Sequence, residues 1–327
     1  MILVTGGSGF IGSNLNAALA AEGQDVIISD WLGQDGDKWR NLYHAPPHRV
    51  VPPEQLDEFL ARELPITCVV HLGAISETTA RDADLVWRTN VTLSQSLWSW
   101  CAKRAVRFIY ASSAATYGDG REGFEDDMSL PALQKLRPLN LYGWSKHAFD
   151  LWVAKQIRDE APAPPNWAGV KFFNVFGPNE YHKGKMISVV KVKQDEIMAG
   201  GPARLFKSDQ PGLADGAQAR DFIYIDDVIA ALQFLMKAPR VAGLFNLGTG
   251  QARSYLDLAR AVCAANNVPE RIEFIDMPEA LKGQYQSFTQ APMARLRALG
   301  FDHNFMTLED GVKTYIQTYL LKADAYR

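Results

Sequence analysis

MILVTGGSGFIG, residues 1–12, is the stretch of sequence that decides the fold of this chain. It begins with an apolar run typical of a buried strand, places Gly6, Gly9 and Gly12 three residues apart, and leads into an amphipathic helical pattern. Glycines at such positions let the chain turn sharply, let a pyrophosphate approach the backbone and let the helix pack close to the strand. The helix N-terminus adds unpaired N–H groups and a partial positive charge. The stretch therefore predicts a strand, a tight turn and a helix that bind a dinucleotide.

A second predicted strand, residues 26–28, ends shortly before Asp30, where a carboxylate can accept hydrogen bonds from ribose hydroxyls. The polar stretch from Trp31 to Arg49 is expected to be a loop at the adenosine end of the cofactor. Asp30 alone favours a free 2′-hydroxyl, whereas Lys38 in this loop could neutralise a 2′-phosphate. The alternative interpretation of Lys38 is a solvated loop lysine, so NADP and NAD both stay open.

The length and composition narrow the class of protein. A chain of 327 residues is expected to form one large domain and one smaller domain. A net charge of −3 gives no basic footprint for nucleic acid, and no apolar run is long enough to span a membrane. Since a strand starts at Ile2 with no basic leader before it, we expect a cytoplasmic protein. Cys68, Cys101 and Cys263 lie far apart in apolar surroundings, so we expect buried thiols and no metal site.

The next predicted strand, residues 67–72, is followed by the segment 73–76 and by a helix expected over about 82–104. The small residues that open the segment 73–76 indicate a backbone that passes close to the cofactor. Asn90 lies inside the helix, where a short amide is unfavourable unless its side chain has a specific partner; ordinary helix packing is the alternative. His71, at the strand end, is interpreted as a hydrogen-bonded structural histidine.

The strongest catalytic pattern lies at and beyond the strand predicted over residues 107–113. Ser113 ends this strand, and doubly wound sheets bind ligands beyond the carboxyl ends of their strands. Tyr142 and Lys146 are four residues apart, on one face of a predicted helix. The ammonium could therefore lower the phenol pKa from its usual value of about 10 and also hold ribose hydroxyls. With a hydrogen bond from Ser113, this arrangement predicts an acid/base centre.

The remaining pattern predicts the domain organisation. Residues 169–175 are expected to form a strand, 222–228 a strand that runs into a helix capped by Asp226 or Asp227, and 244–247 a strand of the first domain. We expect an α/β fold: a Rossmann-type doubly wound parallel sheet with a smaller, discontinuous α/β substrate domain. The expected dinucleotide-binding domain comprises residues 1–177 and 220–250, and the substrate domain comprises residues 178–219 and 251–327.

With its glycine turn, Ser113, Tyr142 and Lys146, the chain resembles the extended short-chain dehydrogenase/reductases, which include the NAD-dependent epimerases and dehydratases. A narrower resemblance, to the ADP-heptose 6-epimerases among them, rests on segments that span nearly the whole chain. The last two of these segments are the most specific. The segments are Gly73–Ser76 with Thr78 and Thr79, Ala111–Gly118, Phe173–Pro178 leading to His182–Gly184, and Leu281–Gln286 with Phe288–Gln290.

The resemblance implies an epimerase that inverts C6 of ADP-D-glycero-β-D-manno-heptose through a transient 6-keto sugar, for lipopolysaccharide inner-core synthesis. It implies catalytic roles for Ser113, Tyr142, Lys146 and Lys183, tightly bound NADP with NAD as the alternative, and a homo-oligomer, which is a pentamer in this family. The implied cofactor-binding residues are Gly6, Gly9, Phe10, Ile11, Gly12, Asp30, Trp31, Lys38, Leu72, Gly73, Ala74, Ile75, Ser76, Asn90, Tyr142, Lys146 and Val175. The implied contacts to the ADP-sugar are Ser113, Asn174, Lys183, Lys185, Phe206, Lys207, Ser208, Arg220 and Tyr285.

The chain departs from this family at Lys185, where a small serine is usual, and at Val192, where histidine is frequent. The proline-rich segment 161–165 and the long loop 207–219 also differ. A UDP-hexose 4-epimerase is an alternative, because it uses the same serine, tyrosine and lysine. A 4,6-dehydratase is disfavoured, because its Asp-Glu pair is replaced here by Ala114-Ala115. A cofactor-sensing protein without turnover is the non-enzymatic alternative.

Overall fold

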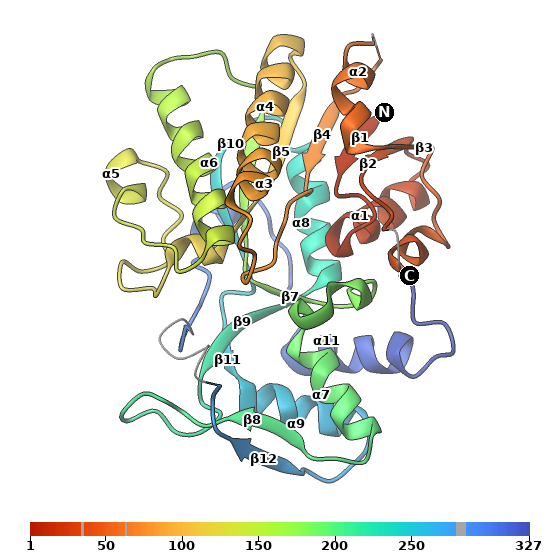
Figure 1. Cartoon of the computed structure of the whole chain (residues 1–327), viewed down its shortest axis with the longest axis vertical. Coiled ribbons are helices and arrows are strands. Elements are labelled where there is room, and N and C mark those ends of the chain that lie inside the picture. Colours follow the sequence, from red (N-terminus) through yellow and green to blue (C-terminus); the bar gives the residue numbers. More distant parts are fainter. Residues whose placement is uncertain (34–35, 63, 279–285) are drawn as a thin grey trace.

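A computed structural model describes residues 1–33, 36–62, 64–278 and 286–327. Its larger part is a seven-stranded sheet in the order β10-β6-β5-β4-β1-β2-β3, with parallel neighbours throughout (Figure 1). The strand order runs outward in opposite directions from β1 and from β4, so right-handed crossovers place helices on both faces. The predicted Rossmann-type sheet is confirmed. Its strands are β1 (Ile2–Thr5), β2 (Val26–Ser29), β3 (Arg49–Val51), β4 (Cys68–His71), β5 (Arg107–Ser113), β6 (Trp167–Phe172) and β10 (Ala242–Leu247).

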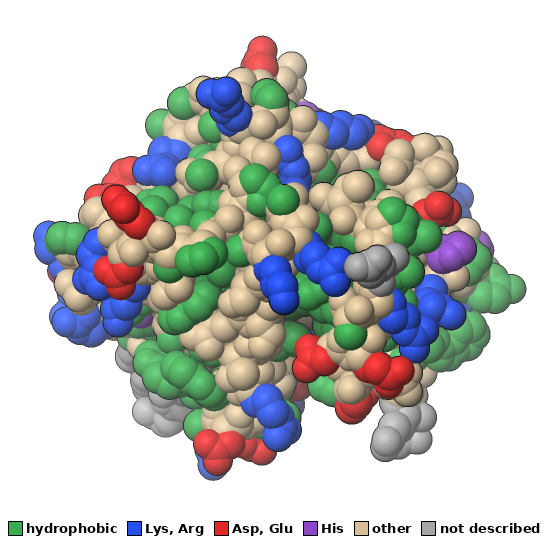
Figure 2. All heavy atoms as spheres, turned by 90° about the horizontal axis from the view of Figure 1, so that it is seen from above, with side chains coloured by type: hydrophobic (Ala, Val, Ile, Leu, Met, Phe, Trp, Pro, Cys, Tyr) green, Lys and Arg blue, Asp and Glu red, His purple; other side chains and the backbone are tan. Residues whose placement is uncertain are grey.

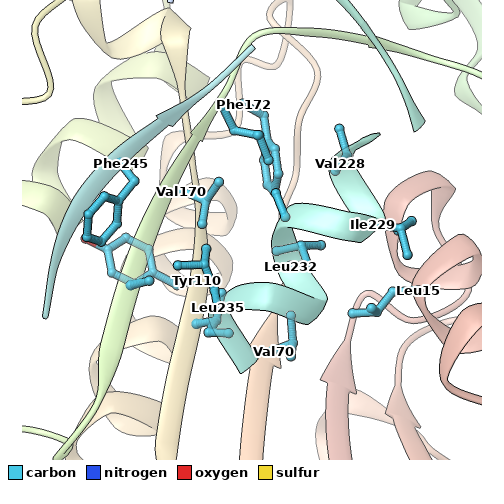
Figure 3. Close-up of a cluster of buried hydrophobic side chains, with 14 of the residues drawn as sticks. Leu15, Val70, Tyr110, Val170, Phe172, Val228, Ile229, Leu232, Leu235 and Phe245 are labelled. Carbon is cyan, nitrogen blue, oxygen red and sulfur yellow. The ribbon is translucent and has the colours of Figure 1, made fainter. Parts of the chain in front are cut away.

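The helices that cover this sheet are α1 (Phe10–Ala21), α2 (Leu56–Leu60), α3 (Ala83–Trp87), α4 (Leu93–Arg104), α6 (Leu141–Arg158) and α8 (Ile225–Lys237). On one face α1 lies against α8, and on the other α3 lies against α6. Figure 3 shows Leu15 of α1 beside Ile229 of α8, with Val70 and Val170 of the sheet facing the same buried cluster. This apolar packing holds the strand ends in fixed positions.

The smaller part of the molecule lies below the large sheet in Figure 1. It contains a three-stranded sheet, β11-β9-β7, and a two-stranded sheet, β12-β8, with α9 packed against α7 and α11. β7 pairs with β9 between the two parts, and we propose that these parts are the two domains expected from the sequence. The elements are β7 (Asn174–Phe176), β8 (Ala203–Phe206), β9 (Ala219–Tyr224), β11 (Ala252–Ser254), β12 (Ile272–Ile275), α7 (Val189–Met198), α9 (Tyr255–Ala265) and α11 (Leu308–Tyr315). Short helices are α5 (Leu130–Leu133) and α10 (Ala294–Ala298).

One loop prediction and one strand prediction were wrong. The stretch from Trp31 to Arg49, predicted as a loop, contains a 3-10 helix, η1 (Lys38–Leu42), and leads into β3 at the sheet edge. No apolar run marks β3, because it is three residues long and two of them are exposed. The strand predicted over 169–175 divides at Phe173, since β6 stays in the large sheet while β7 pairs with β9.

The helix predicted over 82–104 is confirmed, with Asp82 as its N-cap and a π turn at 88–92 within it. The predicted cap of α8 is wrong, because neither aspartate caps that helix. Asp227 lies inside its first turn and instead contacts His303, at 2.7 Å between the carboxylate and Nε2. The carboxylate is thus occupied by a distant segment that local pattern cannot show.

The burial of the cysteines and the mixture of charges on the surface match what the composition predicts. The three cysteines are buried and free, as predicted. Figure 2 shows basic and acidic side chains interspersed on one face of the molecule. Within the described ranges, no helix has the length and apolar character of a membrane span, and no cluster of His, Cys, Asp and Glu side chains could hold a metal ion.

Candidate active site

The glycine turn between β1 and α1 lies directly against the end of β4. Gly6 has a left-handed backbone, with φ of +67°, and a Cβ there would lie 2.6 Å from the nitrogen of Gly73. A Cβ on Gly12 would overlap the carbonyl oxygen of Gly6. Only glycine therefore fits at both positions without a shift of the backbone. Helix α1 begins at Phe10 after Gly9, which has no capping side chain, so the N–H groups of the first turn are available to an anionic ligand.

We expect Gly12→Ala to lower the free energy of unfolding by about 1–3 kcal/mol, because the added methyl must push α1 away from the turn. Cofactor binding should weaken in the same variant, since the N–H groups of α1 move with the helix. Urea unfolding and cofactor titration measure the two effects. Ala20→Ser, on the exposed side of α1, is the matched control and should change neither. A Gly12→Ala variant with wild-type stability and cofactor affinity would contradict this account of the turn.

Asp30 lies at the end of β2 with both carboxylate oxygens already engaged. One oxygen accepts hydrogen bonds from the backbone N–H and the hydroxyl of Ser8, at 3.0 and 2.6 Å. The other forms an ion pair with Lys38 at 2.9 Å, and Lys38 also donates to the carbonyl of Trp31 at 2.7 Å. A pocket of about 390 Å³ opens beside this pair, and its lining includes Lys38 and Tyr181. The ion pair thus places a cation where the adenosine ribose of a dinucleotide is expected.

The side chains of Ser113 and Tyr142 interact at the carboxyl edge of the sheet. Ser113 ends β5, and its hydroxyl is hydrogen-bonded to the phenol of Tyr142 in the first turn of α6. Two local features bring α6 this close. Asn140 caps the helix, accepting from the N–H of Gly143 at 2.8 Å. A Cβ on Gly143 would lie 2.7 Å from the carbonyl oxygen of Ala115, so the glycine lets α6 pack against the turn that follows Ser113.

Burial dominates the electrostatics of the tyrosine and lysine. It raises the pKa of Tyr142, and the hydrogen bond from Ser113 offsets only part of that effect. Burial lowers the pKa of Lys146 to about 8, against the attraction of Asp150. The expectation that Lys146 would lower the phenol pKa is therefore corrected: the net direction is upward, because the cost of burying a phenolate is the larger effect.

Asn90 and His71 hold the cofactor side of the sheet together. The Asn90 amide accepts from the N–H of Ile75 at 2.8 Å and donates to the carbonyl of Ile75 at 3.0 Å and to the hydroxyl of Ser145 at 2.9 Å. It therefore ties the loop after β4 to α6. His71 is buried and contacts the hydroxyl of Thr5 at 2.6 Å, and burial lowers its pKa to about 3. It is a neutral structural histidine, as predicted.

Lys183 lies beside the glycine turn. It belongs to a 3-10 turn, η5 (Tyr181–Met186), and its Nζ is 5.1 Å from the centre of the Phe10 ring. Burial lowers the pKa of Lys183, and the negative charge of Glu180 partly opposes this effect. Glu180 is fully buried and accepts hydrogen bonds from the N–H and hydroxyl of Ser188, at 2.7 and 2.6 Å, which fixes the turn against α7. The structure thus brings the Lys183 side chain next to Phe10, at the end of the glycine turn.

The predicted substrate contacts gather around the start of β9. Arg220 is buried in this strand, with its guanidinium 5.6 Å from the centre of the Tyr255 ring. The segment 206–208 continues from β8, and Gln218 donates to the carbonyl of Lys207 at 3.3 Å, which joins that segment to β9. Two other predicted substrate contacts, Asn174 and Lys185, have exposed side chains, and that of Val175, a predicted cofactor contact, is half-buried.

The segment after Tyr285 connects the substrate side to the catalytic side. Tyr285 itself lies outside the described residues. Ser287 accepts a hydrogen bond from the N–H of Ala219, at 2.8 Å, just before Arg220 in β9. The Gln286 side chain donates to the carbonyl of Gly118, which closes the turn after β5. The described end of this motif, residues 286–289, therefore adjoins both parts of the candidate site.

Sequence reasoning missed two residues that shape the site. Ser8 lies within the glycine turn and binds Asp30 through both its N–H and its hydroxyl. Asp150 lies on α6, on the same face as Tyr142 and Lys146. It follows Lys146 at the same four-residue spacing at which Lys146 follows Tyr142, and this repeated spacing is the signal that could have found it.

The geometry is that of a nicotinamide-dependent enzyme of the short-chain type, and comparisons with known proteins agree. The model of the NAD dependent epimerase/dehydratase family matches residues 2–248. The chain belongs to this family. Residues 2–248 contain the whole large sheet and the four predicted catalytic residues, Ser113, Tyr142, Lys146 and Lys183.

Full-length relatives carry a more specific name. The ADP-L-glycero-D-manno-heptose-6-epimerase of Fusobacterium nucleatum is 43% identical, and that of Nitratidesulfovibrio vulgaris is 46% identical, each over 100% of both chains. Among solved structures, the Helicobacter pylori enzyme of the same name is 27% identical, with a TM-score of 0.78 and coverage of 97% of this chain and 95% of that one. MoeE5 in complex with UDP-glucuronic acid and NAD is 25% identical, with a TM-score of 0.74 and 97% coverage of each chain. The narrow resemblance drawn from the sequence is confirmed.

Proposed function

We propose that this protein converts ADP-D-glycero-β-D-manno-heptose to its L-glycero epimer by inverting C6 through a transient 6-keto sugar. The observation that carries the proposal is the contact between Ser113 and Tyr142, one helical turn from the buried Lys146, at the carboxyl edge of a dinucleotide-binding sheet. Full-length relatives at 43% and 46% identity that bear the name of this epimerase support the choice of sugar.

The residues present fit a nicotinamide dinucleotide. Gly6 leaves no room for a side chain where the backbone meets Gly73, and Gly12 leaves none where α1 meets Gly6. Such glycines allow the close approach that a pyrophosphate needs. We assign the buried ammonium of Lys146 to hold the ribose hydroxyls. When bound, the nicotinamide supplies the hydride acceptor and donor that an unactivated C–H requires, since this bond is not acidic.

The side chains of the protein then handle the proton. Tyr142 takes the proton of the C6 hydroxyl as the carbon becomes planar, and Ser113 polarises the developing carbonyl oxygen. Inversion requires the sugar side chain to rotate so that its other face is presented, which moves the oxygen. We therefore assign Lys183 as the acid/base for the second configuration. The other assigned contacts to the ADP-sugar are Asn174, Lys185, Phe206, Lys207, Ser208, Arg220 and Tyr285.

The direct test is incubation of the purified protein with ADP-D-glycero-β-D-manno-heptose, with C6 inversion followed by NMR. Appearance of the L-glycero epimer is the expected result. No change with this substrate, together with conversion of UDP-glucose, would instead establish a hexose 4-epimerase. Bound cofactor without turnover of either sugar would point to the sensing alternative. A homo-oligomeric assembly and a cytoplasmic location remain predictions from the sequence.

We expect protein purified without added cofactor to carry a bound dinucleotide, because an epimerase restores its cofactor in each turnover and gains nothing from exchange. NADP is our choice, since Lys38 neutralises Asp30 and the pocket beside it leaves room for a 2′-phosphate. Denaturation followed by chromatography of the released nucleotide identifies it. Recovery of NAD would correct the choice of cofactor, and an empty, freely exchanging site would count against an epimerase.

A further inference from the structure

A fully buried ion pair lies behind the contact between Ser113 and Tyr142. Asp150 of α6 and Lys171 of β6 are 1% and 0% exposed, and their charged groups are 3.1 Å apart. The Asp150 carboxylate also accepts hydrogen bonds from the hydroxyl of Ser112 at 2.7 Å and from the phenol of Tyr110 at 3.1 Å. These three partners of the carboxylate come from β5 and β6, beneath the carboxyl edge of the sheet.

Lys171, the other member of the ion pair, is linked through Thr116 to the backbone of Ser113. Lys171 donates to the hydroxyl of Thr116 at 2.7 Å, and Thr116 donates to the carbonyl of Ser113 at 2.7 Å. Ser112 and Thr116, which flank Ser113, are thus both tied to the pair. A buried ion pair contributes little net stability, because burying two charges costs about as much as their attraction returns. Stability alone is therefore a weak reason for this arrangement.

Asp150 also lies on the same face of α6 as Tyr142 and Lys146. Tyr142, Lys146 and Asp150 follow one another at four-residue spacing, so they lie on one face of α6. Lys146 shares its face of α6 with the titratable groups of Tyr142 and Asp150, and His71 of β4, which is neutral, interacts with it from the sheet. Lys171 of β6 faces Asp150. Of these, Asp150 is the group whose negative charge favours the ammonium form of Lys146 and raises its pKa against burial.

We propose that Asp150 is a positioning residue for the epimerase reaction: from one turn along α6 its negative charge favours the ammonium form of Lys146, and with Lys171 its carboxylate anchors Ser113 opposite Tyr142. The proposal rests on the proposed function for its catalytic meaning. Its electrostatic part concerns Lys146 alone and can be measured without turnover.

The test compares two variants that break the same ion pair. Asp150→Asn removes the negative charge and keeps a side chain of the same shape, whereas Lys171→Met removes the positive charge and leaves the carboxylate. The full-length protein as purified is labelled with ¹³C at the lysine ε-carbons, and Lys146→Arg identifies the Lys146 resonance. Its titration midpoint and the alkaline limb of the epimerisation rate are then followed with pH.

We expect Asp150→Asn to move both the Lys146 midpoint and the alkaline limb to lower pH by about one unit, because an adjacent opposite charge is lost. Lys171→Met should leave both unchanged or move them to higher pH. If Asp150→Asn does not fold, the double variant Asp150→Asn/Lys171→Met, which buries no unpaired charge, must still show the downward shift. An unchanged Lys146 midpoint without Asp150, or the same shift in both single variants, would overturn the proposal. Absence of turnover in the wild type would contradict the proposed function and leave the lysine titration a valid test of Asp150.

Discussion

Replacing Tyr142 by phenylalanine is expected to slow epimerisation by about a thousandfold, which is the range that a positioned general acid/base contributes. The variant loses the hydroxyl that contacts Ser113. The initial rate of C6 inversion, followed by NMR, measures the effect.

Two further measurements separate chemistry from folding. The Tyr142→Phe variant should keep its bound cofactor and its melting temperature, because the ring remains and only a hydroxyl is lost. Tyr43→Phe, at an exposed tyrosine far from the glycine turn in sequence, is the matched control and should leave the rate unchanged. A Tyr142→Phe enzyme within tenfold of the wild-type rate would remove this tyrosine from the mechanism.

Lys183→Met is expected to slow overall epimerisation by about a hundredfold, and to do so unequally for the two epimers. If Tyr142 serves one configuration and Lys183 the other, the variant should still oxidise one epimer in a single turnover and fail with the other. Tyr142→Phe should show the opposite preference. The near-ultraviolet absorbance of the reduced nicotinamide, followed after mixing with each epimer, distinguishes the two variants.

Lys185→Met is the matched control for this experiment, since it removes an exposed lysine from the same turn. Lys185 is assigned to substrate binding, so its loss should raise KM for both epimers alike and leave their relative rates unchanged. Full epimerisation by Lys183→Met would end the two-base mechanism. Equal loss with both epimers would reduce Lys183 to a residue that binds the ADP-sugar.

The predictable parts of the site are those that depend on spacing along the chain. The glycine turn is set by residues within twelve positions of one another, and the pairing of Tyr142 with Lys146 needs only one helical turn. The parallel sheet could also be predicted from the sequence, because its central strands are short apolar runs buried on both faces. The edge strand β3 could not be predicted in this way, because two of its three residues are exposed and it forms no buried apolar run.

The electrostatics of the site could not be predicted in this way. The spacing of Tyr142 and Lys146 suggested a lowered phenol pKa, yet burial raises it, and the depth of burial depends on the whole packed domain. Lys171 lies in an otherwise apolar predicted strand, and no local pattern indicates that it meets Asp150 from a helix that precedes it.

By itself the sequence determined the doubly wound sheet, the dinucleotide turn and the helix face that carries Tyr142 and Lys146, because short-range periodicity and glycine spacing encode each of them. Only the tertiary structure decided that β7 leaves the large sheet, that Lys183 lies over Phe10, and that Asp150 and Lys171 pair beneath Ser113. These contacts join elements that are distant in sequence. Their geometry depends on how the elements pack, and above all on the glycines that let α1 and α6 approach their neighbours.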